Sequence, residues 1–262
     1  PAFTFGTTEL DGIWVGKFET TGSATTPTIK PNVTSLTSQN VSTHFTAGQK
    51  FGTSNYLTTT GVSQVDAHMM KNTEWGAVAY LKQSKYGLGT TDIGNNTYNS
   101  NYTYKAGCGP QSAGSTSDGF TCNAYNTDLG KSASTTGNIT GIYDMAGGAE
   151  ESVMGVMKTS DGTALFYSNS GFTTSTLPFN SKYVDQYEYD QTEHNGRILG
   201  DATGETKGWY SEYFDFPYIG APWFKRGCSA FDGSGAGVFC AYGNDGSANG
   251  DISFRSVLAL GA

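Results

Sequence analysis

Long polar stretches without regular apolar spacing fill much of this chain, and they constrain its fold more than any other feature. Residues 88–137 are almost wholly Gly, Thr, Asn, Ser and Tyr, and residues 158–221 form a second, Tyr-rich stretch. Loops this long are uncommon in a compact domain unless they carry a function. We therefore expect a scaffold of short strands into which 88–137 and 158–221 are inserted as long loops.

The composition favours the same class of fold. Charged residues make up only 15% of the chain, and Gly alone contributes 36 residues. A helical bundle would need more Leu, Glu and Lys, and fewer Gly and Thr. The 262 residues show no repeat and no linker, so we predict a single α+β domain over residues 1–262 with little regular secondary structure.

One stretch has the apolar spacing of a helix. It predicts an amphipathic helix over about residues 71–84, which Gly87 is suited to end. The apolar residues assigned to this pattern are Met69, Met70, Trp75, Val78, Ala79 and Leu81.

Strand signals are weaker and lie near the two ends. Residues 9–20 alternate as in a strand, with Ile13, Val15 and Phe18 as apolar anchors. Residues 23–60 are rich in Thr, Ser and Asn, and we expect loop with short strand pieces there. A closing strand is expected over 252–260.

Net charge and hydropathy exclude two kinds of partner. The net charge is −8 and no run of Lys or Arg occurs, whereas nucleic-acid binding needs a basic stripe. No stretch approaches the ~20 apolar residues that span a bilayer. The chain opens at Pro1 without an initiator Met, so we expect that an export or anchoring segment has been removed, and that any membrane attachment would be through it.

The cysteines predict a staple rather than a metal site. Cys108 and Cys122 flank a Gly/Ser-rich loop, which predicts a disulfide in an oxidising compartment. Cys228 and Cys240 are left open, as a disulfide or as isolated thiols. Because no CxxC spacing occurs, a zinc site is not expected. Loop Asp and Asn are compatible with bound Ca²⁺, but no DxDxDG string specifies a site, so no cofactor and no metal ligands are assigned.

Three blocks of sequence carry a family resemblance. TEWGAVAYL at 73–81 comes first, TGNITGIYDMAGGAEESVMG at 136–155 second, and WFKRGC…AGVF…SFRSVL at 223–258 third. The second resembles the G-x-Y-D-M-x-G-N-V-W-E-W signature of formylglycine-generating enzymes and sulfatase-modifying-factor domains, and the third resembles their R-G-G-S…G-F-R ending. The resemblance implies their variant of the C-type-lectin fold. It also implies structural roles for Tyr143, Met145, Gly147, Gly148, Trp223, Arg226, Gly227, Phe254 and Arg255.

The chain departs from that family where catalysis would occur. Glu150 and Ser152 stand where the family usually has Trp. The family's cysteine pair would fall on Asp232 and Gly237, which cannot supply a thiolate. Glu150 and Glu151 are a poor acid–base pair, because neighbours in an extended stretch face opposite sides. We therefore predict no catalytic residues and no enzyme, with a copper- and thiol-dependent oxidase of the formylglycine-generating type as the alternative.

The C-terminal block also resembles the variable region of proteins that retroelements diversify on the same lectin scaffold. In that system, adenine-directed mutation of Asn codons cannot produce Lys, Glu, Gln, Met or Trp. None of these five types occurs in residues 227–254, although they account for 37 of the 262 residues. Chance would produce such a gap about one or two times in a hundred. We therefore predict a variable region at about 227–254.

Within that region, two sets of residues are distinguished. Gly233, 236–239, Gly246 and 253–255 have the character of fixed scaffold. Small, polar and aromatic side chains on a rigid frame are typical of adaptable recognition surfaces, with Phe231 and Tyr242 as anchors. The predicted variable, ligand-binding residues are Ser229, Ala230, Phe231, Asp232, Ser234, Cys240, Tyr242, Asn244, Asp245, Ser247, Ala248, Asn249 and Asp251.

Other scaffold strings indicate where such a protein would act. IWVGKFETTG, IKPNVTS, HMMKNTEWGAVAYLKQSKYG and ASTTGNITGIYDM resemble a group of bacterial surface proteins that often carry a prepilin-like N-terminal segment. The resemblance implies the exposed head of a pilin-like cell-surface protein, or a phage protein of the same type, that binds a protein or glycan. A fixed-sequence pilin-like adhesin is the remaining alternative.

Overall fold

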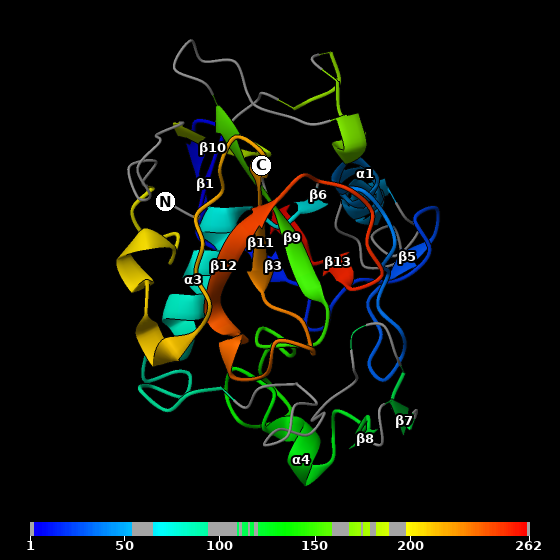
Figure 1. Cartoon of the computed structure of the whole chain (residues 1–262), viewed down its shortest axis with the longest axis vertical. Helices are drawn as coiled ribbons and strands as arrows, with labels where there is room; N and C mark the ends of the chain where they lie inside the picture. The colour runs from blue at the N-terminus through cyan, green and yellow to red at the C-terminus, as the bar shows by residue number, and fades with distance from the viewer. Residues whose placement is uncertain are drawn as a thin grey trace.

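The computed structural model describes residues 3–53, 65–93, 109, 112–114, 116–117, 120–158, 168–173, 175–178, 182–188 and 198–260. In these ranges short strands predominate and helices are few, which confirms the α+β class (Figure 1). The α-helices are α1 (Val41–Thr53), α3 (Asn72–Gln83) and α4 (Asp128–Lys131). Single 3₁₀ turns occur at Ser168–Ser170, Gly204–Thr206, Trp209–Ser211 and Gly233–Gly235.

The strands are mostly two to five residues long, and their bounds are as follows. They are β1 (Thr4–Phe5), β2 (Thr8–Glu9), β3 (Trp14–Val15), β4 (Thr21–Gly22), β5 (Pro27–Thr28), β6 (Val65–Met69), β7 (Thr116–Ser117), β8 (Phe120–Thr121), β9 (Glu150–Lys158), β10 (Asp185–Glu188), β11 (Trp223–Gly227), β12 (Gly237–Asn244), β13 (Ile252–Phe254) and β14 (Ser256–Leu260).

The main sheet is curled into a half-barrel around β9. Its order is β10-β9-β11-β12, with β13 pairing β9 as well. β10 and β13 run parallel to β9, whereas β11 is antiparallel to both β9 and β12. A smaller sheet has the order β3-β14-β6, and its strand β14 directly follows Arg255. The sheet built on β9 therefore joins the second and third sequence blocks, which lie about 70 residues apart.

The two faces of the main sheet bury two different cores. Side chains alternate along β9, so Val153 and Met157 enter one apolar cluster while Met154 and Val156 enter the other. The first cluster includes Trp75 and packs against α3. The second includes residues of α1, such as Phe45. The main sheet thus lies between α3 and α1 (Figure 1).

The predicted helix is present as α3, over Asn72–Gln83. Trp75, Val78 and Ala79 are buried on one stripe, as the spacing indicates. Met69 belongs instead to the preceding strand β6, Met70 lies between β6 and α3, and Leu81 is 54% exposed, so those three assignments to the helical stripe are wrong.

The prediction of loop and short strand pieces for residues 23–60 is wrong at α1. Asn40 caps this helix, because its Oδ1 accepts from the N–H of Thr43 at 3.0 Å. Gly48 lets α1 lie directly on β6, since a Cβ there would stand 2.8 Å from the N of Met69. Close packing on the sheet therefore stabilises a helix whose own residues have low helix propensity.

The two terminal strand predictions need smaller corrections. Residues 9–20 are not one strand: β3 covers only Trp14–Val15, where it pairs with β14. The closing strand is two strands, β13 and β14, because Arg255 between them turns into the core. The predicted insertions 88–137 and 158–221 lie partly outside the described residues. Cys108 lies wholly outside them, so its pairing with the buried Cys122 stays a prediction.

The block at 141–149 forms a buried turn. Tyr143 and Met145 are fully buried, and Gly147 and Gly148 have φ of 76° and 80°. Gly148 also has a packing reason, because a Cβ there would lie 2.5 Å from Oε1 of Glu19. Left-handed backbone and close approach both call for glycine. The turn delivers the chain directly into β9.

Candidate ligand-binding surface

β11 and β12 place two C-terminal side chains on one side of the main sheet. Lys225 of β11 is the register partner of Tyr242 of β12, and paired residues share a face. The Lys225 Nζ lies 4.0 Å from the centre of the Tyr242 ring. Tyr213 packs edge-on against the same ring, with centroids 5.6 Å apart. This side of the sheet therefore carries a small aromatic group around a lysine.

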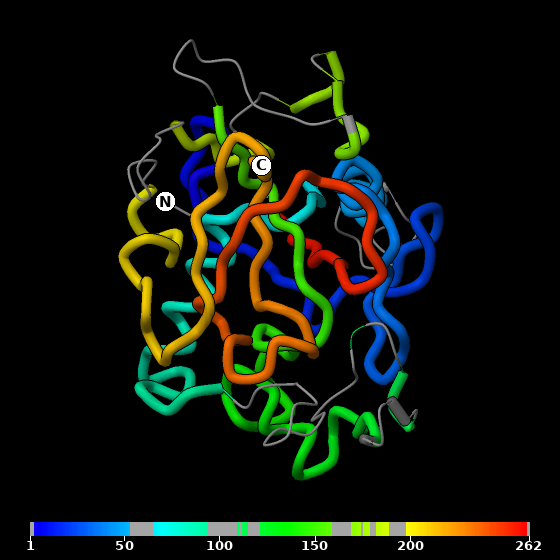
Figure 2. The backbone as a smooth tube through the Cα atoms, in the orientation of Figure 1, coloured from blue at the N-terminus to red at the C-terminus, as the bar shows by residue number. Residues whose placement is uncertain are grey.

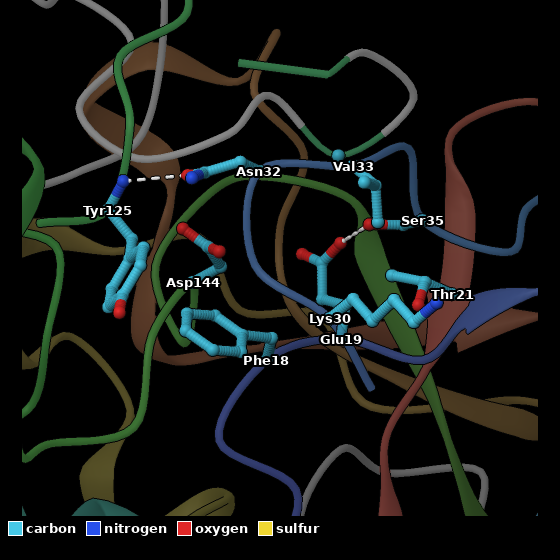
Figure 3. Close-up of a pocket in the computed structure, with 10 residues that line it drawn as sticks. Phe18, Glu19, Thr21, Lys30, Asn32, Val33, Ser35, Tyr125 and Asp144 are labelled. Carbon is cyan, nitrogen blue, oxygen red and sulfur yellow. Dashed lines mark hydrogen bonds between the residues drawn. The ribbon is translucent and has the colours of Figure 1, made fainter. Parts of the chain in front are cut away.

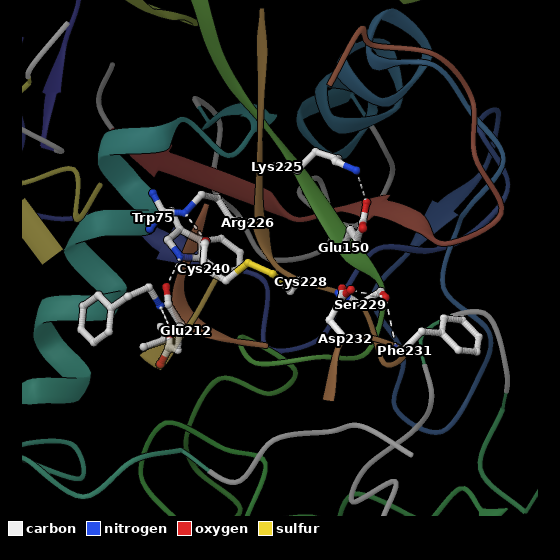
Figure 4. The surroundings of a disulfide bond; sticks show 12 residues. Trp75, Glu150, Glu212, Lys225, Arg226, Cys228, Ser229, Phe231, Asp232 and Cys240 are labelled. Atoms are coloured by element: carbon white, nitrogen blue, oxygen red, sulfur yellow. Dashed lines mark hydrogen bonds and ion pairs between the residues drawn. A yellow bond between two sulfur atoms is a disulfide. The ribbon is translucent and has the colours of Figure 1, made fainter. Parts of the chain in front are cut away.

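The same lysine is held by a carboxylate of β9. Lys225 and Glu150 form an ion pair, with side chains 7% and 11% exposed (Figure 4). Burial raises the pKa of Glu150, and the Lys225 ammonium partly offsets this, while the carboxylates of Asp232 and Asp251 raise it further. Asp232 and Asp251 come from two different loops. Both are near enough to Glu150 for their negative charges to act on it.

A disulfide fixes the first of these loops. Cys228 and Cys240 are bonded, with Cα atoms 5.8 Å apart, and both side chains are buried with Ala236 beside Tyr242 (Figure 4). This settles the pairing that the sequence left open. Asp232 braces the loop from within, because its Oδ2 accepts from the N–H and hydroxyl of Ser229 at 2.7 and 2.9 Å. Phe231 points away from the disulfide and is 38% exposed.

Replacing both cysteines, Cys228→Ser with Cys240→Ser, should lower the free energy of unfolding by about 2–3 kcal/mol. The bond closes a loop of sequence separation 12, and the loss is chiefly the chain entropy that this closure removes from the unfolded state. Urea unfolding of the oxidised parent and the double variant measures the difference. Equal midpoints would contradict a stabilising role for the bond.

Side-chain and backbone hydrogen bonds hold the second loop, 244–251. The Oδ1 atoms of Asn244, Asp245 and Asn249 accept from backbone N–H groups two residues on, at 2.7, 2.9 and 3.0 Å. The loop also lies along the segment that enters α1 (Figure 2), where its carbonyls accept from the N–H groups of Ser38 and Val41 at 2.8 and 3.1 Å. These hydrogen bonds fix the backbone of the loop.

The structure separates the thirteen predicted ligand-binding residues into two groups. Ten are at least partly exposed: Phe231, Asp232, Ser234, Tyr242, Asn244, Asp245, Ser247, Ala248, Asn249 and Asp251. Ser229, Ala230 and Cys240 are buried and are corrections to the prediction. Cys240 is in the disulfide, Ala230 donates to the carbonyl of Gly148, and Ser229 is bonded to Asp232. None of these three can contact a ligand through its side chain.

Sequence reasoning missed Tyr213 and Asp215, which lie beside β12. The N–H of Asp215 donates to the carbonyl of Ala241 at 2.9 Å, and Phe214 between them packs on the core. Tyr213 is 51% exposed. The signal was present in the aromatic-rich string WYSEYFDF, where Tyr213, Asp215 and the apolar Phe214 alternate as in a strand. We call the exposed side chains of 213–215, 231–234 and 242–251 the C-terminal surface.

A second candidate site lies beside the buried turn at 141–149. Phe18, Glu19, Asn32, Ser35 and Asp144 line a cavity of about 20 Å³, room for about one water (Figure 3). Glu19 accepts from Ser35 and from the N–H of Ala149. Burial and the nearby Asp144 raise its pKa well above the ordinary value. A buried acid with both oxygens bonded is a structural feature of the turn rather than a reactive group.

The described residues form neither a metal-binding cluster nor a membrane-spanning helix. In the part of the chain that it describes, no three His, Cys, Asp or Glu side chains come together as a metal site would require. Bound Ca²⁺, with which the loop Asp and Asn are compatible, therefore stays without assigned ligands. Within the same residues, no helix has the length and apolar character needed to cross a bilayer.

Comparison with known protein families and with curated proteins finds no match for this chain. The geometry of the C-terminal surface and the sequence pattern within it are therefore the features that bear on the function of this chain.

Proposed function

We propose that this chain is a ligand-binding surface protein of C-type-lectin-like fold, and that its C-terminal region is a retroelement-diversified binding site. The ligand would be a protein or a glycan, met outside the cell by a pilin-like surface protein or a phage particle. In this proposal the chain binds and does not catalyse.

One observation carries the proposal. Within the C-terminal region, the residues interpreted from sequence as fixed scaffold are the buried ones, and most of those interpreted as variable are exposed. All of the residues interpreted as fixed scaffold, Gly233, 236–239, Gly246 and 253–255, are buried. Ten of the thirteen interpreted as variable are exposed in part or in full. Diversification requires this arrangement, because changes at exposed positions cost little stability whereas changes in the core cost much.

The frame beneath those positions has the rigidity that a changeable surface needs. A disulfide, the Lys225–Glu150 pair and the loop contacts to Ser38 and Val41 hold the backbone through groups other than the exposed side chains. The side chains of Asp232, Asn244, Asp245 and Asn249 add further hydrogen bonds to it. Binding surfaces that reuse one backbone gain affinity when that backbone is already ordered.

The oxidase alternative would need a reactive thiolate in this region. Cys228 and Cys240 are 1% and 0% exposed and bonded to each other. A buried disulfide offers no thiolate to a substrate, so the proposal favours binding. Turnover that is lost when both cysteines are replaced would favour the oxidase instead.

The decisive experiment compares the DNA that encodes residues 222–262 with its flanking genome. We expect a near-identical copy that differs only at adenines, beside a reverse transcriptase gene, and the differing codons should fall on the ten exposed positions. If no such copy exists and sister isolates carry an unchanged block, the diversified site is refuted and a fixed-sequence adhesin takes its place.

A further inference from the structure

We infer that the C-terminal surface, in the version that this chain carries, binds a cationic protein segment rich in Arg or Lys. The inference rests on the proposed binding function and adds the chemistry of the partner.

The aromatic part of the surface is partly uncovered. Tyr213 and Phe231 are 51% and 38% exposed, and Tyr242 is partly exposed between Tyr213 and the disulfide. Aromatic rings in such positions supply contact area at a small cost in side-chain entropy, and their faces attract cations.

The exposed charges around these rings are mostly negative. In residues 208–260 the basic residues are Lys225, Arg226 and Arg255, which are 6%, 0% and 0% exposed. Asp215, Asp232, Asp245 and Asp251 in the same stretch are all at least partly exposed. One exposed cation, Lys207, lies at the edge of this surface, with its Nζ 5.6 Å from the centre of the Phe214 ring. The surface therefore offers a partner four carboxylates against one accessible cation. An anionic glycan or an acidic protein would be repelled.

The chain itself shows how a cation fits between these groups. The Lys225 ammonium lies between the Glu150 carboxylate and the Tyr242 ring, at 4.0 Å from the ring centre. Carboxylate on one side and ring on the other is the combination that stabilises a partly desolvated ammonium or guanidinium. The exposed part of the surface also carries a ring and a carboxylate close together in the chain, at Tyr213 and Asp215 and at Phe231 and Asp232.

The test is an NMR titration of the ¹⁵N-labelled protein with a defined probe, the ten-residue peptide of alternating Arg and Ser. We expect amide shifts confined to 213–219, 229–235 and 242–251, and affinity that falls with added salt. The matching peptide of alternating Glu and Ser should cause no shifts there. A neutral trisaccharide of N-acetylglucosamine is the third probe.

Two double variants separate a specific surface from general attraction to an acidic protein. Asp232→Asn with Asp251→Asn should weaken the Arg/Ser peptide by roughly fivefold, because two carboxylates lose their charge while an acceptor oxygen remains. Asp11→Asn with Asp128→Asn removes the same net charge from exposed sites elsewhere and should leave affinity unchanged. Tyr213→Leu should weaken binding through the ring alone.

Three outcomes would overturn the inference. These are shifts outside the named segments, equal effects of the two double variants, or no binding of the Arg/Ser peptide. Binding of the trisaccharide alone would replace the cationic partner with a glycan and leave the binding function intact. The peptide titration and the genomic comparison can each fail without the other, so failure of the partner chemistry is distinguishable from failure of diversification.

Discussion

Replacing Arg255 by Met should lower the free energy of unfolding by about 3–5 kcal/mol. Arg255 and Glu151 form an ion pair in which both side chains are 0% exposed. The guanidinium also donates to the carbonyls of Gly16 and Tyr143, each at 2.8 Å. Met keeps much of the volume but leaves a buried carboxylate without its cation and two carbonyls without donors. Urea unfolding followed by circular dichroism measures the loss.

Two further variants show whether the buried charge is the cause. Glu151→Met combined with Arg255→Met should recover part of the loss, since no unpaired charge remains, although the two carbonyls still lack donors. Lys131→Met is the matched control, because it breaks an exposed ion pair in which the Lys131 Nζ lies 3.0 Å from the Asp128 Oδ1. It should change the free energy of unfolding by less than about 0.5 kcal/mol. An Arg255→Met protein as stable as Lys131→Met would contradict this account.

Sequence could predict some elements of the fold, such as the role of Arg255, and not others. The resemblance gave Arg255 a structural role, because it closes a motif. The spacing of Trp75, Val78 and Ala79 likewise gave α3. By contrast, α1 has Thr, Ser and glycines at helical positions, and its stability comes from lying against β6. The Asn40 cap, followed by Val41, His44 and Phe45 at helical spacing, was the available signal.

For the candidate surface, sequence could predict which residue types vary but not which of them are covered. Ser229, Ala230 and Cys240 have the same small or polar character as their exposed neighbours. They are buried only because the disulfide and the turn at Gly148 close over them. Lys225 and Glu150 were separated by 75 positions, so only the strand pairing of β9 with β11 brings them together. Long-range pairing of this kind is invisible to local patterns.

Raising the pH through the neutral range should destabilise the protein through Glu212. Burial and the nearby charge of Asp92 raise the pKa of Glu212 to about 8, and only part of this is offset by the Phe239 N–H and by Lys82. The unfolded chain releases this proton near the ordinary value of 4.5, whereas the folded protein holds it until about pH 8. The contribution to stability is therefore fully present below about pH 4.5 and is lost as pH rises through 8, by a few kcal/mol.

The variant Glu212→Gln isolates this contribution, because Gln cannot ionise but keeps an oxygen that accepts from the Phe239 N–H. In the parent, the nitrogen of Phe239 lies 2.6 Å from Oε2 of Glu212. The free energy of unfolding, measured from about pH 5 to about pH 9, should fall less steeply in Glu212→Gln than in the parent. The control variant Glu9→Gln changes an exposed carboxylate and should keep the parental slope. His68 supplies a separate part of that slope. The carboxylates of Glu74 and Asp66 outweigh its burial and raise its pKa to about 9, so its contribution is lost between about pH 6.5 and 9 in all three proteins. Parallel curves for the parent and Glu212→Gln would mean that Glu212 is already ionised in the folded protein at neutral pH.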